Sequence, residues 1–294
     1  MEIKFINRSD KSIEIERPPG EKLLNFLYRT LLGEKLVLPI AKQKFISELY
    51  GKRMDSSSST KSIVPFVKSL GIDMSEAQKK ISEFESFNDF FYRKLKPGAR
   101  PIENGLVSPG DGRLLAFENI SEVGAFFVKG KKFTLKEFLQ NDKLAEEHAN
   151  SSMVILRLAP NDYHRYHFPF VGMPSEAKEI KGVYYSVSPI SVKENFTEVF
   201  CENKREICQL KTTDRGEILI IPVGATMVGS LNSTFEADAL VKKGEEMGYF
   251  AFGGSTVVLL FNSNSFQLDK DLLENTKNKL ETYVKMGEKI GTPI

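Results

Sequence analysis

Gly253-Gly254-Ser255-Thr256 places a hydroxyl directly after two glycines, in a run of aromatic and β-branched residues that predicts one buried strand. Glycine weakens a strand, because it adds backbone entropy and has no side chain to pack, so the pair needs a compensating role. Ser255 could attack the carbonyl of Gly254, where no side chain blocks the approach. The alternative is a β-bulge whose serine bonds to local backbone.

Two of the three histidines, His164 and His167, lie three residues apart, just after the turn Pro160-Asn161-Asp162. Histidine titrates near neutrality, so this pair could move protons at the end of a strand. With Asp162 it could also offer three ligands to a metal, but no Cys or Glu cluster completes such a site, and we expect no metal. A pair of structural histidines is the remaining alternative.

Asp111 lies between two glycines in Ser108-Pro109-Gly110-Asp111-Gly112-Arg113, a setting typical of a turn residue. A carboxylate on a tight turn could also orient a histidine. Asp111, His167 and Ser255 would then supply the acid, base and nucleophile of a triad, which is defined by geometry and not by chain order.

Composition narrows the class of protein. A chain of 294 residues can bury a substantial core, and its net charge of +2 argues against a dedicated nucleic-acid binder. Two cysteines, Cys201 and Cys208, are too few for a disulfide framework and fit a reducing compartment. No signal peptide is recognisable, and no apolar run approaches the ~20 residues that span a bilayer. We expect a cytoplasmic chain that could lie on a membrane without crossing it.

The N-terminal part predicts a hairpin over residues 1–17 and two amphipathic helices near 21–32 and 36–50. Residues 1–54 carry 11 basic and 7 acidic side chains. A basic amphipathic surface can lie among lipid headgroups, and Leu27 and Leu31 are expected to face the lipid. The alternative is that these helices pack on the core.

The rest of the chain changes from helical to β-rich near Pro101. One helix is expected to end at Leu70, with Gly71 as its cap. A second is expected to begin at a capping box at residues 75–78, and a third at Ser86. A fourth is expected over Thr134 to His148. Strands are expected at 114–117, 126–128, 153–156, 217–222 and 223–231. No regular βα alternation is present, so the predicted class is α+β: a largely antiparallel β catalytic domain at 99–294 behind a helical, membrane-surface part at 1–98.

Several segments together resemble the phosphatidylserine decarboxylase proenzymes. They are SPGDGR, DYHRYHFP, VGATMVGS and FGGSTV, together with FNDFFYRKLKPGARPI at 87–102 and YSVSPI…FCENKRE at 185–206. The resemblance covers roughly residues 87 to 261 well and the N-terminal helices more loosely.

The resemblance implies that Asp111, His167 and Ser255 are a self-processing triad. His167 would take the proton of Ser255, Asp111 would orient the imidazole, and Ser255 would attack the carbonyl of Gly254. Elimination from the resulting ester would leave dehydroalanine, which hydrolyses to a pyruvoyl group and ammonia. The products would be a β chain of residues 1–254 and an α chain of residues 255–294.

The pyruvoyl group made from Ser255 would be the cofactor. Its carbonyl would form a Schiff base with the amine of phosphatidylserine and accept electrons as CO₂ leaves, giving phosphatidylethanolamine. The resemblance implies that His164 is the acid/base group of this stage. It also implies a homodimer, peripheral on the cytoplasmic face of the cell membrane. The alternatives are a serine hydrolase, although Ser255 lacks the Gly-x-Ser-x-Gly elbow, and a non-enzymatic lipid-surface protein.

Overall fold

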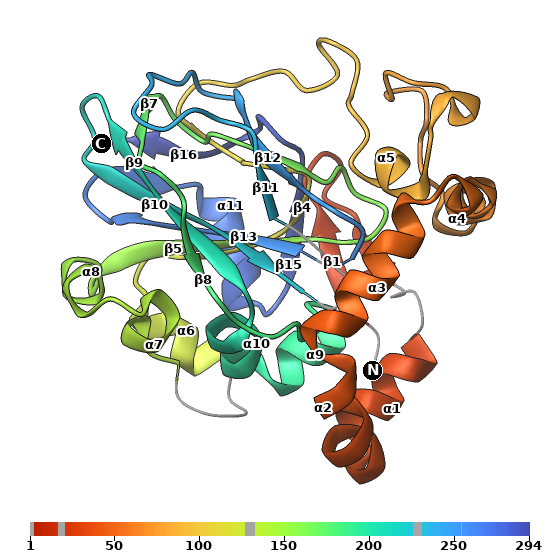
Figure 1. The fold of residues 1–294 in the computed structure, drawn as a ribbon. Helices are drawn as coiled ribbons and strands as arrows, with labels where there is room; N and C mark the ends of the chain where they lie inside the picture. The colour runs from red at the N-terminus through yellow and green to blue at the C-terminus, as the bar shows by residue number, and fades with distance from the viewer. Residues whose placement is uncertain (1–2, 17–20, 127–132, 226–230, 254) are drawn as a thin grey trace.

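A computed structural model of the chain describes residues 3–16, 21–126, 133–225, 231–253 and 255–294. Its centre is a ten-stranded sheet that runs across the molecule in Figure 1, with strand order β2-β1-β15-β4-β5-β13-β10-β9-β7 and with β8 paired to β9. Along this order the strands are β2 Ile13–Glu16, β1 Ile3–Asn7, β15 Glu281–Val284, β4 Gly112–Phe117, β5 Ser151–Leu158, β13 Ser255–Asn262, β10 Glu217–Gly224, β9 Arg205–Thr212 and β7 Gly172–Pro174, and β8 is Lys178–Ile180.

The pairs of this sheet are antiparallel, except that β1 runs parallel to β15. Its middle strands are buried along almost their whole length, because both faces of the sheet are covered. Continuous apolar runs such as Val257 to Phe261 fit such a position better than alternation would. The predicted α+β class with a largely antiparallel sheet is confirmed.

The described residues also form two three-stranded sheets. One has the order β11-β12-β6, with β11 Leu231–Ser233, β12 Glu246–Phe250 and β6 Arg165–His167. The other has the order β14-β16-β3, with β14 Phe266–Leu268, β16 Lys289–Pro293 and β3 Leu106–Val107.

The segment that holds the two glycines joins two different sheets. β12 ends at Phe250 in a small sheet, and β13 begins at Ser255 in the large one. The prediction of one continuous strand through the glycines is therefore wrong: both flanks are strands, but they have different partners. Gly253 has φ +144°, a conformation that favours glycine. Gly254 lies outside the described residues.

Helices α1–α5 gather on one side of the molecule, on the right in Figure 1, and α6–α10 lie below the large sheet in that view. The helices are α1 Glu21–Arg29, α2 Leu38–Ala41, α3 Lys44–Asp55, α4 Ile63–Leu70, α5 Phe87–Phe91, α6 Ser121–Phe126, α7 Leu135–Leu139, α8 Asp142–Glu147, α9 Pro189–Glu194, α10 Phe196–Glu202 and α11 Lys270–Lys277. Part of this helical region has a second core of its own, made of Met54, Ile63, Ile72, Phe84, Phe87, Phe90 and Phe91.

Two predicted helix ends are confirmed, and one predicted helix is divided in two. Gly71 closes α4 with φ +62°, and the Ser86 side chain caps α5 through the amide of Asp89, as expected. The helix expected over Thr134 to His148 is instead α7 and α8, because Gln140 adopts φ +46° between them.

Two other predictions of element type are wrong. The capping-box pattern at 75–78 opens no helix; Ala77 instead forms a β-bridge with Leu95. Phe126, expected in a strand, ends α6, while residues 127–128 lie outside the description. The strand expected over 223–231 is described only at its ends, in β10 and β11, since 226–230 lie outside it as well.

The N-terminal hairpin, β1 and β2, was predicted correctly, but it belongs to the large sheet through the pairing of β1 with β15. The division of the chain at residues 98 and 99 stays a prediction. Within the described ranges, no helix combines the length and apolar character that crossing a bilayer requires.

Candidate active site

Ser255 is the first residue of β13, opposite Leu158 of β5 and Gly224 of β10. Its side chain is completely buried, and its Oγ has no hydrogen-bond partner among the described residues. Most buried hydroxyls are paired, because an unpaired one loses its bonds to water without replacement. Such a group calls for an explanation, and a reactive role is one.

His164 lies in the loop that follows β5, and its imidazole is fully buried. Its Nδ1 is 3.0 Å from the carbonyl oxygen of Asp162, which can only accept, so Nδ1 carries the proton and Nε2 holds the lone pair. Within the described part of the chain, Nε2 has no partner. Burial lowers the pKa of His164 to about 3, so the ring is neutral at physiological pH.

His167, at the end of β6, is also buried and neutral, since burial lowers its pKa. Its Nδ1 donates to the carbonyl of Gly244 at 3.0 Å, which leaves the Nε2 lone pair to accept from the Tyr163 hydroxyl at 3.1 Å. This tautomer is the one a general base needs. Its basic nitrogen is engaged by Tyr163, and no hydrogen bond to Ser255 is found in the described residues.

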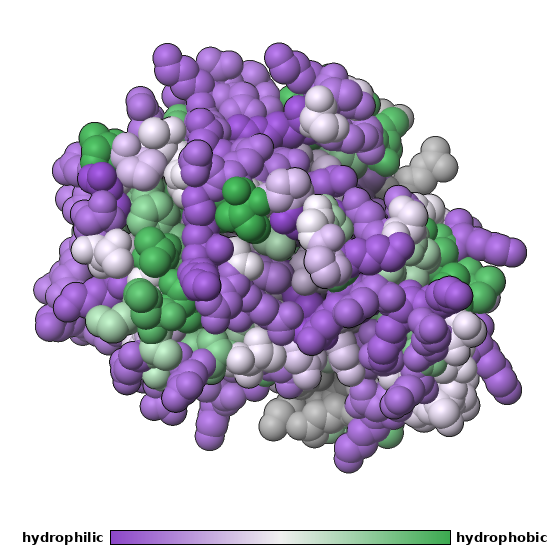
Figure 2. All heavy atoms as spheres, turned by 90° about the horizontal axis from the view of Figure 1, so that it is seen from above, coloured by the Kyte–Doolittle hydropathy of each residue, from purple (hydrophilic) through white to green (hydrophobic). Residues whose placement is uncertain are grey.

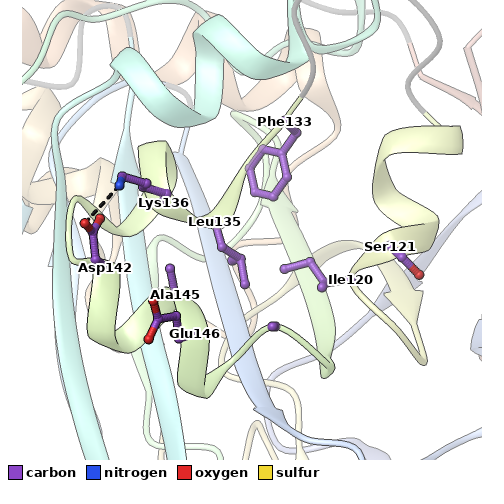
Figure 3. Close-up of a pocket in the computed structure, with 9 residues that line it drawn as sticks. Ile120, Ser121, Phe133, Leu135, Lys136, Asp142, Ala145 and Glu146 are labelled. Atoms are coloured by element: carbon purple, nitrogen blue, oxygen red, sulfur yellow. Dashed lines mark hydrogen bonds and ion pairs between the residues drawn. The ribbon is translucent and has the colours of Figure 1, made fainter.

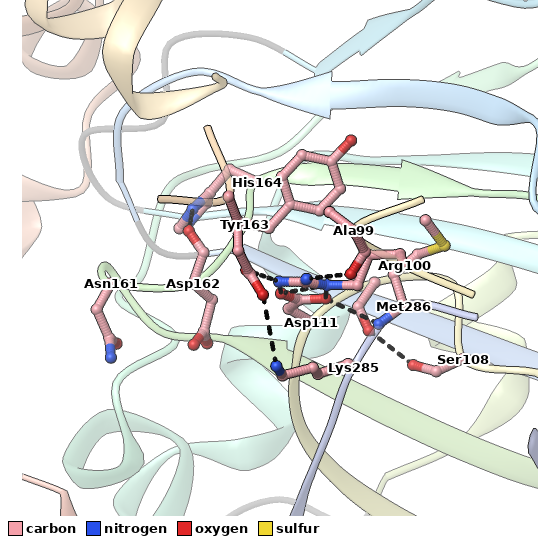
Figure 4. A network of polar contacts seen from close by, with 12 residues as sticks. Ala99, Arg100, Ser108, Asp111, Asn161, Asp162, Tyr163, His164, Lys285 and Met286 are labelled. Atoms are coloured by element: carbon pink, nitrogen blue, oxygen red, sulfur yellow. Dashed lines mark hydrogen bonds and ion pairs between the residues drawn. The ribbon is translucent and has the colours of Figure 1, made fainter. Parts of the chain in front are cut away.

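Asp111 occupies the turn before β4 and is buried. Its carboxylate accepts bonds from Arg100 Nε at 2.9 Å, from Arg100 Nη2 at 2.6 Å and from the Met286 amide at 2.8 Å (Figure 4). The turn itself lies beside β6, because the amide of His167 donates to the carbonyl of Pro109 at 2.7 Å.

The predicted triad residues therefore lie in one region, but hydrogen bonds among the described atoms do not connect them. Asp111 is paired with Arg100, and His167 with Tyr163 and Gly244. Their roles remain predictions for the self-cleavage reaction. Gly254, the proposed cleavage point, lies outside the description.

An aromatic side chain of α5 connects His164 with the segment before Ser255, a link that the sequence did not predict. The ring centroid of Phe91 is 3.9 Å from that of His164 and 4.8 Å from that of Phe252. The amide of Phe252 donates to Asn88 Oδ1 at 2.9 Å, so α5 also fixes the backbone that leads into the glycines.

A buried charge network next to the site was also missed. Asp162 Oδ2 accepts from the Ala159 amide and from Arg113, which in turn contacts Glu16 Oε2 at 3.0 Å. Burial raises the pKa of Asp162 to about 6, although Arg113 opposes the shift. Arg113 lies opposite Arg157 in β5, and two arginines within otherwise apolar strands were the available signal.

A surface hollow of ≈ 420 Å³ lies elsewhere, between α6, α7 and α8 (Figure 3). Lys136 and Asp142 form an ion pair at its edge, and Ile120, Phe133 and Leu135 provide apolar walls. Asp111, His164, His167 and Ser255 do not line it. No group of three His, Cys, Asp or Glu side chains suited to a metal is found in the described ranges.

Comparisons with known proteins identify the family to which the chain is similar. The family model for phosphatidylserine decarboxylase matches residues 87–292. The chain is similar to the phosphatidylserine decarboxylase proenzyme of Fusobacterium nucleatum, with 50% identity over 98% of this chain and 97% of that protein. The proenzymes of Clostridium perfringens and Clostridium tetani are each 48% identical over 98% of this chain, covering 99% and 98% of those proteins.

Among solved structures, glucose permease IIA from Mycoplasma capricolum has 12% identity and a TM-score of 0.28, covering 63% of this chain and 92% of that one, which does not establish a shared fold. The sequence relatives, by contrast, cover almost the entire chain at high identity. This chain belongs to the phosphatidylserine decarboxylase family.

Proposed function

We propose that this chain is a proenzyme that cleaves itself between Gly254 and Ser255 and then converts phosphatidylserine to phosphatidylethanolamine and CO₂. Close relatives with that name support the activity. The observation that carries the assignment to a residue is the buried, unpaired hydroxyl of Ser255, directly after the two glycines. A serine hydrolase is disfavoured because Ser255 lacks the Gly-x-Ser-x-Gly elbow.

In self-cleavage, the Ser255 Oγ–H bond breaks as Oγ adds to the Gly254 carbonyl, and the peptide bond is replaced by an ester. His167 is the proposed proton acceptor, because it is neutral and its lone pair is on Nε2. The proton reaches it either through the Tyr163 hydroxyl or after that hydroxyl has moved away. Asp111 stabilises the resulting imidazolium through its negative charge.

The ester is then lost by β-elimination, which takes the α-proton of residue 255 and releases the carboxylate of Gly254. Water converts the dehydroalanine to a pyruvoyl group and releases ammonia. The surroundings fit this small, uncharged group, since the Ser255 side chain makes no hydrogen bond to the described residues that the conversion would break.

In decarboxylation, the pyruvoyl carbonyl supplies the electron sink for breaking the carbon–carbon bond. The chain's own contribution would be an apolar surface and a proton. The rings of Phe91 and Phe252 provide apolar surface beside His164, and an apolar setting favours a carboxylate that leaves as neutral CO₂. His164, whose Nε2 has no partner among the described residues, is the proposed acid/base group at the substrate. An anionic substrate would raise the pKa of His164 toward the range that a general acid needs.

We also propose that the protein binds at a membrane surface, peripherally on the cytoplasmic face, as a homodimer. The segment of α1, α2 and α3, whose helices lie on the right and lower right of Figure 1, carries many exposed apolar side chains: Leu23, Leu31, Leu32, Leu36, Ile40, Phe45 and Leu49. The face seen in Figure 2 is mostly hydrophilic, with only separate apolar patches. Leu27, expected to face lipid, is instead buried in the main core.

The test is the intact mass of the purified protein. Wild type should appear as chains of residues 1–254 and 255–294, whereas Ser255→Ala should remain one chain of 33.2 kDa without decarboxylase activity. Ser191→Ala is a matched control, because Ser191 is also fully buried and its Oγ has no partner in the described ranges, but it does not follow the glycines. Cutting of Ser255→Ala between 254 and 255 would refute the mechanism, and an uncut wild type with esterase activity would favour a hydrolase.

A further inference from the structure

Arg93 follows α5 and is buried, with 6% of its surface exposed. A guanidinium has five N–H donors. The only hydrogen bonds that the described residues offer it run from Nη2 to the carbonyls of Asn161 and Asp162, both at 3.4 Å, beyond the usual 2.7–3.2 Å range. Nε has no partner among them. The guanidinium also lies 5.4 Å from the ring centroid of Phe90, a cation–π contact that supplies no negative charge. Arg93 therefore carries a buried positive charge without a hydrogen-bonded anion among the described residues.

The nearby carboxylates are already paired with other arginines. Asp111 is held by Arg100, and Asp162 by Arg113. Their charges act on Arg93 from a distance, but burial dominates and lowers the pKa of its guanidinium. A buried charge is costly unless an opposite charge joins it, so this position suits an anion that the chain itself does not supply.

Arg93 lies next to the proposed acid/base group. Its Nη2 contacts the carbonyl oxygen of Asp162, the same atom that accepts from His164 Nδ1. Its charge also contributes to the lowered pKa of His164. An anion bound to Arg93 would thus lie beside the imidazole of His164.

The proposed substrate has two anionic groups, a carboxylate and a phosphodiester. The carboxylate loses its charge as CO₂ leaves, so an arginine on it would stabilise the ground state more than the transition state. The phosphodiester keeps its charge throughout and lies only a few bonds from the reacting carbon. Planar N–H donors match phosphate oxygens well.

We propose that Arg93 binds the phosphodiester of the substrate headgroup and thereby sets the headgroup beside His164, an assignment that rests on the proposed function. Arg93 is then a binding residue: its removal should raise KM much more than it lowers kcat.

The experiment measures inhibition of the processed enzyme by two soluble probes that lack a primary amine and so cannot react with a carbonyl. Glycerophosphocholine has the phosphodiester without a carboxylate, and glycine betaine has the carboxylate without a phosphate. Arg93→Gln should raise the inhibition constant of glycerophosphocholine and the KM for phosphatidylserine by about 10- to 100-fold, the range for a lost charge-assisted hydrogen bond. Inhibition by glycine betaine should not change.

Arg165→Gln is the matched control, since Arg165 is similarly buried but is paired with Glu246 and with the Tyr92 carbonyl. It should lower the melting temperature and leave both inhibition constants unchanged. If Arg93→Gln fails to fold or mature, Arg93→Lys, which keeps the charge and loses the planar donors, is measured instead. The proposal is overturned if both probes inhibit the Arg93 variant as they inhibit wild type, or if only betaine inhibition is lost, which would assign Arg93 to the carboxylate. A wild type that does not mature or decarboxylate would instead contradict the proposed function.

Discussion

Arg100 holds the carboxylate of Asp111 through both Nε, at 2.9 Å, and Nη2, at 2.6 Å. The same Nη2 lies 2.9 Å from Glu76 Oε2, so one arginine serves two carboxylates. In the described part of the uncleaved chain, Asp111 therefore acts on His167 through its charge and not through a hydrogen bond. Burial lowers the pKa of His167, and the charge of Asp111 is among the influences that oppose this shift.

Asp111→Asn should slow self-cleavage, because it removes the charge that stabilises the His167 imidazolium. His167→Ala should slow it by about 10²–10⁴-fold, the usual contribution of one general base. The fraction of cut chain against time, read from intact mass, measures both. Glu76→Gln removes the second carboxylate that Arg100 contacts and leaves Asp111 in place, so this variant should be cut at the wild-type rate. Equal rates for Asp111→Asn and wild type would remove Asp111 from the reaction.

Leu31→Glu should weaken binding to phosphatidylserine-containing vesicles without affecting self-cleavage, since Leu31 is 74% exposed beside α1. Transfer of one leucine side chain from water is worth about 1.5–3 kcal/mol, so a loss of about tenfold or more is expected in vesicle co-sedimentation. Leu240→Glu is the control, because Leu240 is 66% exposed but lies in the β-rich part. Equal binding by the two variants would argue against the proposed membrane surface.

A different prediction applies to Leu27, which lies in α1. It packs in the main core, so Leu27→Ala should lower the free energy of unfolding by about 2–5 kcal/mol, as measured by denaturant titration of the uncleaved Ser255→Ala chain. Leu31→Ala should change it little. A Leu27→Ala protein as stable as its parent would place Leu27 outside the core.

The fold was predictable where one strand or helix end carries its own signal. Strand periodicity identified β1 and β2, and Gly71 and Ser86 marked helix ends correctly. The strand through Gly253 was predicted wrongly, because residues 246–262 look like one strand locally. The segment becomes two strands because β12 pairs with β6 and β13 pairs with β5, and both partners lie far away in the sequence.

The site was predictable to the extent that residue type reveals chemistry. A serine after glycines and two histidines after a turn are visible in the sequence. The environment that tunes them is not visible there. Phe91 contacts His164, and Arg93 contacts the Asp162 carbonyl that His164 also contacts, only after α5 packs against the loop following β5. Likewise, the pairing of Asp111 with Arg100 depends on a tertiary contact that no local pattern encodes.

Stability toward acid should depend on two buried groups, His164 and Asp162, whose pKa values are shifted in opposite directions. His164 has a folded pKa of about 3, below its usual 6.5, so the native state binds fewer protons and the protein loses stability as pH falls through this window. Asp162 has a folded pKa of about 6, above its usual 3.8, so the native state binds more protons. The stability that this group contributes is lost as pH rises through that interval. In the Ser255→Ala background, His164→Gln should flatten the fall in melting temperature between about pH 7 and about pH 4, and Asp162→Asn should steepen it. If the melting temperatures of Ser255→Ala and of its two double variants fall in parallel with pH, these pKa shifts are contradicted.

The two histidines should separate the two chemical stages. His167 is assigned to proton removal from Ser255, and its Nε2 is held by Tyr163. His164 is assigned to proton transfer at the substrate, and its Nε2 is free of partners in the described residues. His164→Ala should therefore still yield two chains with a carbonyl at the new N-terminus, yet lose about 10²–10⁴-fold in CO₂ release.

Two measurements on the same His164→Ala preparation test this division: intact mass with a carbonyl-reactive probe for maturation, and CO₂ release for turnover. His148→Ala is the control, because His148 is buried beside Ser151, outside the predicted site, and should affect neither stage beyond a loss of stability. If His164→Ala matures and turns over normally, His164 has no role in decarboxylation. If it does not mature although it folds, the two stages share this residue, and the unpaired Nε2 of His164 becomes the better candidate for the base that activates Ser255.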